Sequence, residues 1–195
     1  MRVLMTMLAG GIIALACNLP SIAIAAGSDP QSRQEASSAD RTNDDRVLIL
    51  DLINRYGATH DFGSPDEYAD LFTADAEILV GSGPAIVKGR EGLIAQAKRD
   101  HERFGGAPGP DGKSSSIMRH LISNAQVTLT GSDTADGQSY VTTIVQKGDI
   151  GPAILSVGRY EDHFRKQNGQ WRIFQRRIIM DFGNSDLAKK LGFTK

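Results

Sequence analysis

The hydrophobic periodicity of this chain changes halfway along the sequence, and this change restricts the fold more than any other feature. In the first half, apolar residues recur with helical spacing, as in Leu52, Ile53 and Tyr56. In the second half, long segments alternate between apolar and polar residues, which predicts strands, and the Asn168-Gly169 pair is typical of a tight hairpin turn. Helices followed by a meander of strands predict an α+β domain built around an antiparallel sheet.

The expected elements follow from the positions of caps, glycines and prolines. Helices are expected at residues 44–57, starting at Asp44 or Asp45, at 65–72 and at 89–104. A small hairpin is expected at 77–80 and 85–87, and long strands at 116–130, 138–147, 153–166 and 170–181. Residues 105–115, rich in glycine, form a long loop, which is either a lid or a tolerated surface insertion.

Composition and charge exclude one class of function. The chain has 195 residues, with 22 basic and 23 acidic side chains and a net charge of -1. A nucleic-acid-binding domain normally carries a basic excess, which this chain lacks. The length is sufficient for one domain with a substantial core.

The N-terminal segment is typical of an export signal. An apolar run from Val3 to Leu15 follows Arg2, and Ala23 to Ala25 offers the small residues that signal peptidase needs. We expect a signal peptide at 1–25, a flexible linker at 26–43, the domain at 44–183 and a C-terminal tail at 184–195. The protein is then exported, periplasmic or secreted, and not stably associated with a membrane; the alternative is a membrane anchor that is never cut.

Cys17 is the only cysteine, and it lies within the predicted signal. Its surroundings faintly resemble a lipoprotein box, so lipidation is a minor alternative. If cleavage follows Ala25, the mature protein contains no cysteine. Disulfides, thiolate metal sites and cysteine nucleophiles are then excluded.

Several segments in a fixed order resemble one protein family. They are RYGATHDFGSPDEYADLFTADAEI, the GREGL helix start, RHLISN, and GRYEDHF followed by NGQWRIFQRR. Together they resemble the SnoaL-like branch of the nuclear-transport-factor-2-like superfamily, over about residues 45–182. The resemblance implies a cone, in which a strongly curved antiparallel sheet wraps against three N-terminal helices around an apolar cavity. Homodimers are common in the family.

The same resemblance implies a proton-transfer site at Tyr56, Asp61 and His120, since the dehydratases of the family carry a tyrosine, an aspartate and a histidine at matching positions. A carboxylate beside an imidazole fixes its tautomer, and the imidazole can move a proton at carbon. A phenol can stabilise the oxyanion that develops. Either His120 or Asp61 could act as the base.

Alternation within the His120 strand selects the expected substrate-binding residues. Met118, Ile122 and Asn124 share the face of His120, and Asn124 could hydrogen-bond to a substrate. Taken one at a time, Tyr56, Asp61 and His120 could instead be a core tyrosine, a turn carboxylate and a half-buried histidine.

The remaining histidines and the arginines of the last strand are not expected to take part in proton transfer. His60 is expected at the helix-end surface, His101 at the cavity mouth or in solvent, and His163 on the opposite face of the sheet. Spaced histidine ligands are missing from the sequence, and His60 and Asp61 are expected to face different ways, so we expect no metal. Tyr140 and Trp171 are expected to serve packing. The final strand carries three arginines that are expected on a solvated face, although one could hold an anionic substrate: Arg172, Arg176 and Arg177.

The family includes scytalone dehydratase, bile-acid dehydratases, ketosteroid isomerase and non-catalytic carriers, so fold does not fix function. The resemblance implies a cofactor-free lyase, dehydratase-type, acting on a small, largely apolar cyclic or aromatic hydroxy or carbonyl compound. Isomerisation or carbon–carbon cleavage would need the same groups. A small-molecule carrier with the same pocket is the main alternative, and an interaction module with a collapsed cavity is a third.

Overall fold

The computed structural model describes residues 30–105, 117–147 and 149–192, and side chains from Arg41 onward. The elements in chain order are α1 (Pro30–Phe62), α2 (Pro65–Ala69), β1 (Phe72–Val80), β2 (Ala85–Lys88), α3 (Gly89–Phe104), β3 (Met118–Leu129), β4 (Thr134–Lys147), β5 (Ile150–Gln167), β6 (Gln170–Gly183) and α4 (Ser185–Lys190). The predicted signal, Cys17 and residues 106–115 of the predicted loop lie outside the described residues.

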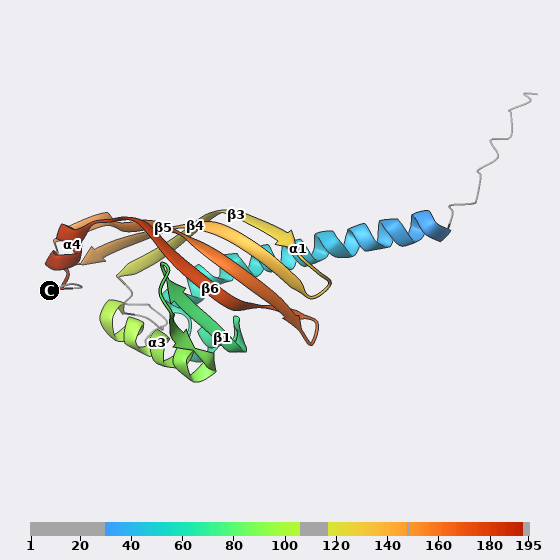
Figure 1. Cartoon of the computed structure of the whole chain (residues 1–195). Coiled ribbons are helices and arrows are strands. Elements are labelled where there is room, and N and C mark those ends of the chain that lie inside the picture. Colours follow the sequence, from blue (N-terminus) through green and yellow to red (C-terminus); the bar gives the residue numbers. More distant parts are fainter. Residues whose placement is uncertain (1–29, 106–116, 148, 193–195) are drawn as a thin grey trace, which may run out of the picture.

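The six strands form one curved, open sheet in the order β2-β1-β6-β5-β4-β3 (Figure 1). Strands β3 to β6 form an antiparallel meander, as the sequence predicts. Strand β1 pairs with β6 in parallel. The last strand of the meander, β6, therefore lies beside the small hairpin of β1 and β2 in the same sheet. The α+β class and the curved sheet are therefore confirmed.

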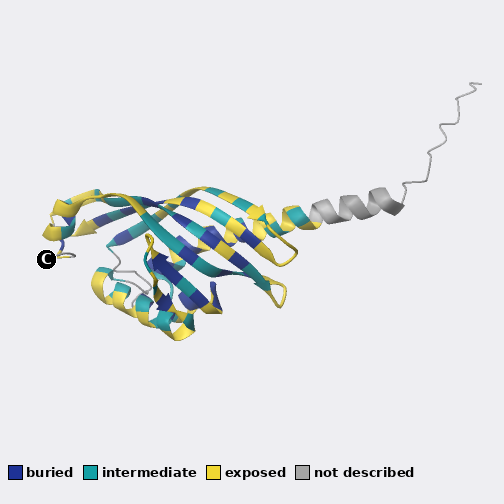
Figure 2. Cartoon of the chain, in the orientation of Figure 1, coloured by how far each residue is buried: buried dark blue, intermediate teal, exposed yellow. Residues whose placement is uncertain are grey.

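The concave side of the sheet holds the core, and α1 lies against it (Figure 1). Buried positions alternate with exposed ones along β4 and β5 (Figure 2). The apolar face of α1 includes Ile49, Leu52 and Ile53, each at most 1% exposed. This spacing of three and four residues is the one that places side chains on a single helix face.

Helix α1 begins at Pro30, well before the predicted start, so the flexible linker predicted at 26–43 is wrong for residues 30–43. Proline is suited to the first helical turn, and the alanine, glutamate, glutamine and arginine residues that follow are good helix formers. A polar composition therefore does not prevent a helix. No helix in the described part of the chain is both long and apolar enough to cross a membrane.

Two further boundaries differ from the prediction. Helix α2 ends at Ala69 and β1 begins at Phe72, so Phe72 packs from a strand and not from a helix. The predicted C-terminal tail contains α4, which is capped by the side chain of Asn184. The hairpin at Asn168-Gly169 is confirmed, with both residues at positive φ, as a type I′ turn requires.

Candidate active site

A cavity of about 460 Å³ opens between the concave face of the sheet, the end of α1 and α3. Tyr56 and His60 line it from α1, and His120 lines it from β3. The other lining residues come mainly from α3 and the centres of β4, β5 and β6: Val80, Gln96, Asp100, Arg103, Phe104, Met118, Val141, Thr143, Leu155, Ser156, Gly158, Tyr160, Ile178, Ile179 and Met180. Most of these side chains are apolar, and such a lining is typical of a small-molecule site.

Asp61 and His120 form a close pair, with His120 in the cavity wall and Asp61 behind it. His120 Nδ1 lies 2.7 Å from Asp61 Oδ1, and the backbone N–H of His120 donates to Asp61 Oδ2 over 2.8 Å. The carboxylate of Asp61 is thus engaged through both oxygens, and it is not among the residues that line the cavity. A carboxylate that accepts from Nδ1–H fixes the tautomer in which Nε2 is free to accept a proton.

His60 is buried, so its predicted position at the helix-end surface is wrong. Because α1 continues to Phe62, His60 lies one turn beyond Tyr56 and stacks on its ring at 5.6 Å. Its ring also contacts the ring of His120 edge to face at 4.5 Å. The i, i+4 spacing from Tyr56 was the sequence signal that could have revealed this position.

Two carboxylates flank His60. Its Nε2 lies 3.3 Å from Asp100 Oδ2, and its Nδ1 lies 3.9 Å from Asp61 Oδ1. The ring is 7% exposed, so solvent screens these interactions little. His60 is therefore the imidazole of the cluster that is best placed to carry a positive charge.

The pKa values separate the two histidines. Burial lowers the pKa of His60, but Tyr56, Asp100 and Asp61 together outweigh burial and raise it to about 10. Burial also lowers the pKa of His120, and the hydrogen bond to Asp61 offsets this only in part because the nearby His60 lowers it further. Burial would raise the pKa of Asp61, but the hydrogen bonds from His120 and the nearby His60 ring lower it to about 2. At neutral pH the cluster thus contains a carboxylate, a charged His60 and a neutral His120.

Tyr56 is 2% exposed and lies among other aromatic rings. Tyr160 and Tyr68 contact its ring at 5.6 and 5.7 Å. Burial raises the pKa of both neighbouring tyrosines well above the usual range, so their hydroxyl groups stay protonated. Tyr68 and Tyr160 are therefore neutral phenols beside the ring of Tyr56.

A buried ion pair lies beneath this aromatic group, and here the sequence-based prediction is wrong. Arg176 was expected on a solvated face, yet it is 0% exposed. Its Nε and Nη2 donate to the two carboxylate oxygens of Asp162 over 2.8 and 2.7 Å. The guanidinium carbon lies 3.9 Å from the ring centre of Tyr56 and 4.1 Å from that of Tyr160. Such a cation beneath two aromatic faces stabilises their packing.

The predicted substrate-binding residues fall in three different places. Met118 is buried and lines the cavity. Ile122 packs against the core cluster and lies outside the cavity lining. Asn124 is exposed at a β-bulge, where the register shifts between Ser123 and Gln126, and its φ is 52°. The bulge interrupts the alternation on which the prediction for Asn124 relied.

Other predictions can be placed directly. His101 lies behind the site, with Nε2 3.3 Å from the carbonyl oxygen of His60. His163 is on the opposite face, as predicted, and pairs with Asp136 over 2.6 Å. Trp171 is buried and donates to Asp45, whereas Tyr140 is half exposed and does not serve the core.

The His60, Asp61 and His120 ligand atoms lie within 4.8 Å of one another, so the reasoning that His60 and Asp61 face apart is wrong. These residue types could ligate zinc. However, the 2.7 Å separation of His120 Nδ1 and Asp61 Oδ1 is that of a direct hydrogen bond. A metal ion between these atoms would have to break that bond.

Gly57 allows α1 to approach β3 closely. A Cβ atom at this position would lie 2.9 Å from the carbonyl oxygen of His120. Gly57→Ala should therefore push the strand that carries His120 away from α1 and lower stability by about 1–3 kcal/mol, measured by urea unfolding. Gly151→Ala is the control, because nothing lies within 4 Å of its Cβ. Equal stability of the two variants would contradict the close approach.

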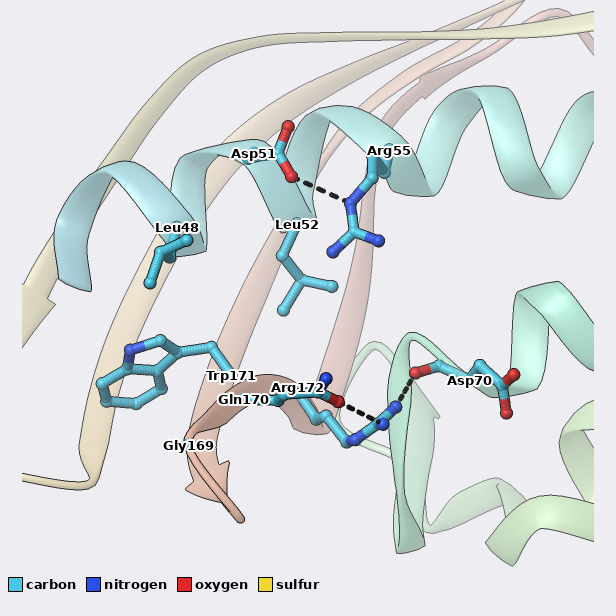
Figure 3. Close-up of a pocket in the computed structure, with 9 residues that line it drawn as sticks. All are labelled: Leu48, Asp51, Leu52, Arg55, Asp70, Gly169, Gln170, Trp171 and Arg172. Carbon is cyan, nitrogen blue, oxygen red and sulfur yellow. Dashed lines mark hydrogen bonds and ion pairs between the residues drawn. The ribbon is translucent and has the colours of Figure 1, made fainter. Parts of the chain in front are cut away.

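A second hollow, of about 350 Å³, lies between residues 48–55 of α1 and the turn between β5 and β6 (Figure 3). Leu48 and Leu52 approach Trp171 there, and the charged groups are already paired, as in the 2.9 Å contact between Arg55 and Asp51. None of the proton-transfer residues lies in this hollow. The chemistry of the described residues is therefore concentrated in the first cavity.

Comparisons with known proteins agree with this architecture. A variant of Rv3472, a protein of unknown function from Mycobacterium tuberculosis, is similar at 27% identity with a TM-score of 0.63, over 76% of this chain and 78% of that one. An NTF2-like protein with a cystatin-like fold from Novosphingobium aromaticivorans is similar at 24% identity with a TM-score of 0.65, over 84% and 96%. A proposed scytalone dehydratase from the same organism is similar at 22% identity with a TM-score of 0.62, over 75% and 90%. The curated proteins include no significant match.

The family comparison is more specific. The model of the SnoaL-like domain matches residues 41–177, which is most of the chain and includes every residue of the Tyr56, Asp61 and His120 set. The segments that suggested this resemblance lie within the matched region. The chain therefore belongs to the SnoaL-like family.

Proposed function

We propose that this protein is a cofactor-independent lyase of the dehydratase type, in which His120 is the base and Tyr56 stabilises the oxyanion. The substrate class is a largely apolar cyclic or aromatic compound with a carbonyl and a hydroxyl group. An isomerase would use the same groups. The likeness in fold to a proposed scytalone dehydratase is compatible with this function.

One observation carries the proposal, namely the engagement of Asp61 by His120. Because His120 occupies both oxygens of Asp61, the carboxylate is poorly placed to be the base itself. It instead orients a neutral imidazole whose Nε2 remains available at the cavity wall. This favours His120 over Asp61, two alternatives that the sequence left open.

The proposed reaction uses two residues that line the cavity, His120 and Tyr56. His120 removes a proton from the carbon next to the carbonyl, and the electron pair of the broken C–H bond forms an enolate. The hydroxyl of Tyr56 donates to the enolate oxygen. Collapse of the enolate forms the C=C bond and breaks the C–O bond, and the imidazolium of His120 returns the proton to the leaving hydroxyl, which departs as water.

A probe ketone tests the proton transfer without knowledge of the natural substrate. We expect the protein to accelerate deuterium incorporation next to the carbonyl of 2-tetralone in D₂O, followed by proton NMR. Tight binding of 2-tetralone with exchange at the buffer rate would favour the carrier alternative. Dehydration itself would then be sought with β-hydroxy ketones of similar size.

His60 gives this site a measurable pH dependence. Its pKa is about 10 in the folded protein and 6.5 for an unperturbed histidine, so its contribution to stability is complete below about pH 6.5 and is lost as the pH rises toward 10. His60→Gln should remove this fall in stability, measured by urea unfolding between pH 6.5 and 10. The exposed His163 provides the control, since His163→Gln should leave the slope unchanged. A slope that persists in His60→Gln would contradict a charged His60.

Export and dimer formation remain predictions from the sequence and the family. We propose a periplasmic or secreted homodimer. Mass spectrometry of the protein recovered from cells would test cleavage before Ala26, and sedimentation would test the dimer.

A further inference from the structure

Helix α4 is firmly attached beside the cavity. The Asn184 side chain accepts from the N–H of Leu187 over 2.9 Å, and the Asn184 backbone N–H donates to the carbonyl of Leu155 on β5 over 2.8 Å. Leu187 and Leu191 are buried in a small core cluster that also contains Met118. Since Met118 lines the cavity, the same cluster supports α4 and the cavity wall.

A hollow of about 370 Å³ lies between α4 and the end of α3, and it adjoins the cavity. Five residues line both spaces: Arg103, Phe104, Leu155, Ser156 and Met180. The remaining lining residues belong to the end of β6 and to α4, including Ser185 and Ala188. The two spaces therefore share a wall of five residues, and α4 lines the second space on its other side.

The lining of this hollow indicates what could occupy it. Met180 lies at the junction and is 59% exposed, although it is a large apolar side chain. Among the described residues that line the hollow, Arg103 alone is ionisable, and its side chain lies over the ring of Phe104 at 5.3 Å. An apolar occupant would cover Met180 and gain hydrophobic free energy.

We propose that this hollow is a second substrate compartment, which binds an alkyl chain or further apolar ring attached to the ring held at His120. This inference rests on the proposed function for the place of the reacting ring. The compartment implies that the substrate is elongated and that its end distant from His120 is apolar. Helix α4 is then a specificity element.

A series of 4-alkylphenols tests the compartment by binding alone. Calorimetric titration of phenol and its 4-ethyl, 4-butyl and 4-hexyl derivatives should show affinity rising by up to about fourfold for each added methylene. Ala188→Trp, which fills the hollow, should abolish this rise and leave the affinity for phenol unchanged. Lys189→Trp, on the exposed side of α4, is the matched control and should keep the rise. Ser185→Trp fills the hollow from the other end of α4 and replaces Ala188→Trp if that variant misfolds.

Two results would overturn the compartment: no rise in affinity with chain length in the unmodified protein, or a rise that persists in a filling variant that folds. These results are separate from failure of the proposed function. A protein that shows the rise but does not exchange 2-tetralone protons has the compartment without the chemistry. A protein that exchanges protons but shows no rise has the chemistry without the compartment.

Discussion

His120→Ala should lower the protein-dependent rate of deuterium exchange into 2-tetralone by about 10²- to 10⁴-fold, the usual contribution of a positioned general base. The side chain removed lines the cavity, and its Nδ1 is held by Asp61. The exchange rate at saturating ketone gives the loss in turnover. The dissociation constant, measured by calorimetry, should change little, because alanine removes no part of the apolar lining.

The chain provides a matched control on its surface. His163 and Asp136 form a second histidine–aspartate pair at 2.6 Å, but both side chains are more than half exposed and face away from the cavity. His163→Ala should therefore leave the exchange rate unchanged. Comparison of the two variants separates a histidine–aspartate pair in an apolar cavity from the same pair in water.

Asp61→Asn should also slow exchange, because an amide can donate as well as accept and no longer imposes one tautomer on His120. The loss should be smaller than in His120→Ala, since the imidazole remains. If His120→Ala retained full exchange while Asp61→Asn abolished it, the base would be Asp61, and the proposed division of tasks would be reversed.

Much of the site could be predicted from the sequence because helix periodicity and family resemblance point to the same residues. Tyr56 follows Leu52 by four residues and lies on the same helix face in the structure. His60 follows by the same step, but it was missed because the helix was expected to weaken at Gly57. Gly57 instead serves the close contact with the strand that carries His120.

The buried ion pair could not be predicted in the same way. Arg176 and Asp162 are cross-strand partners on β6 and β5, a relation that depends on register. The register between these strands shifts between His163 and Phe164, and a shift of one residue exchanges the two faces of a strand. A charged residue in an alternating strand is normally exposed, so composition favoured the opposite prediction.

Removing one partner of this pair should cause the largest loss of stability in the described core. Arg176→Met leaves the carboxylate of Asp162, 3% exposed, without its two charge-assisted hydrogen bonds. An uncompensated buried charge of this kind costs about 3–5 kcal/mol. Urea unfolding at neutral pH measures the loss, and Asp136→Asn, which breaks an exposed pair, should cost less than about 1 kcal/mol.

A double variant separates two contributions to the free energy of unfolding: that of the ion pair, and the penalty for leaving one buried charge without its partner. Arg176→Met combined with Asp162→Leu removes both charges and keeps the volume apolar, so most of the lost stability should return. Exchange of 2-tetralone should nevertheless stay reduced in the double variant, because the guanidinium 3.9 Å from the ring of Tyr56 is gone. Recovery of both stability and exchange would mean that the pair supports neither the fold nor the phenol. Recovery of stability without recovery of exchange would mean that Arg176 supports proton transfer through its contact with the ring of Tyr56.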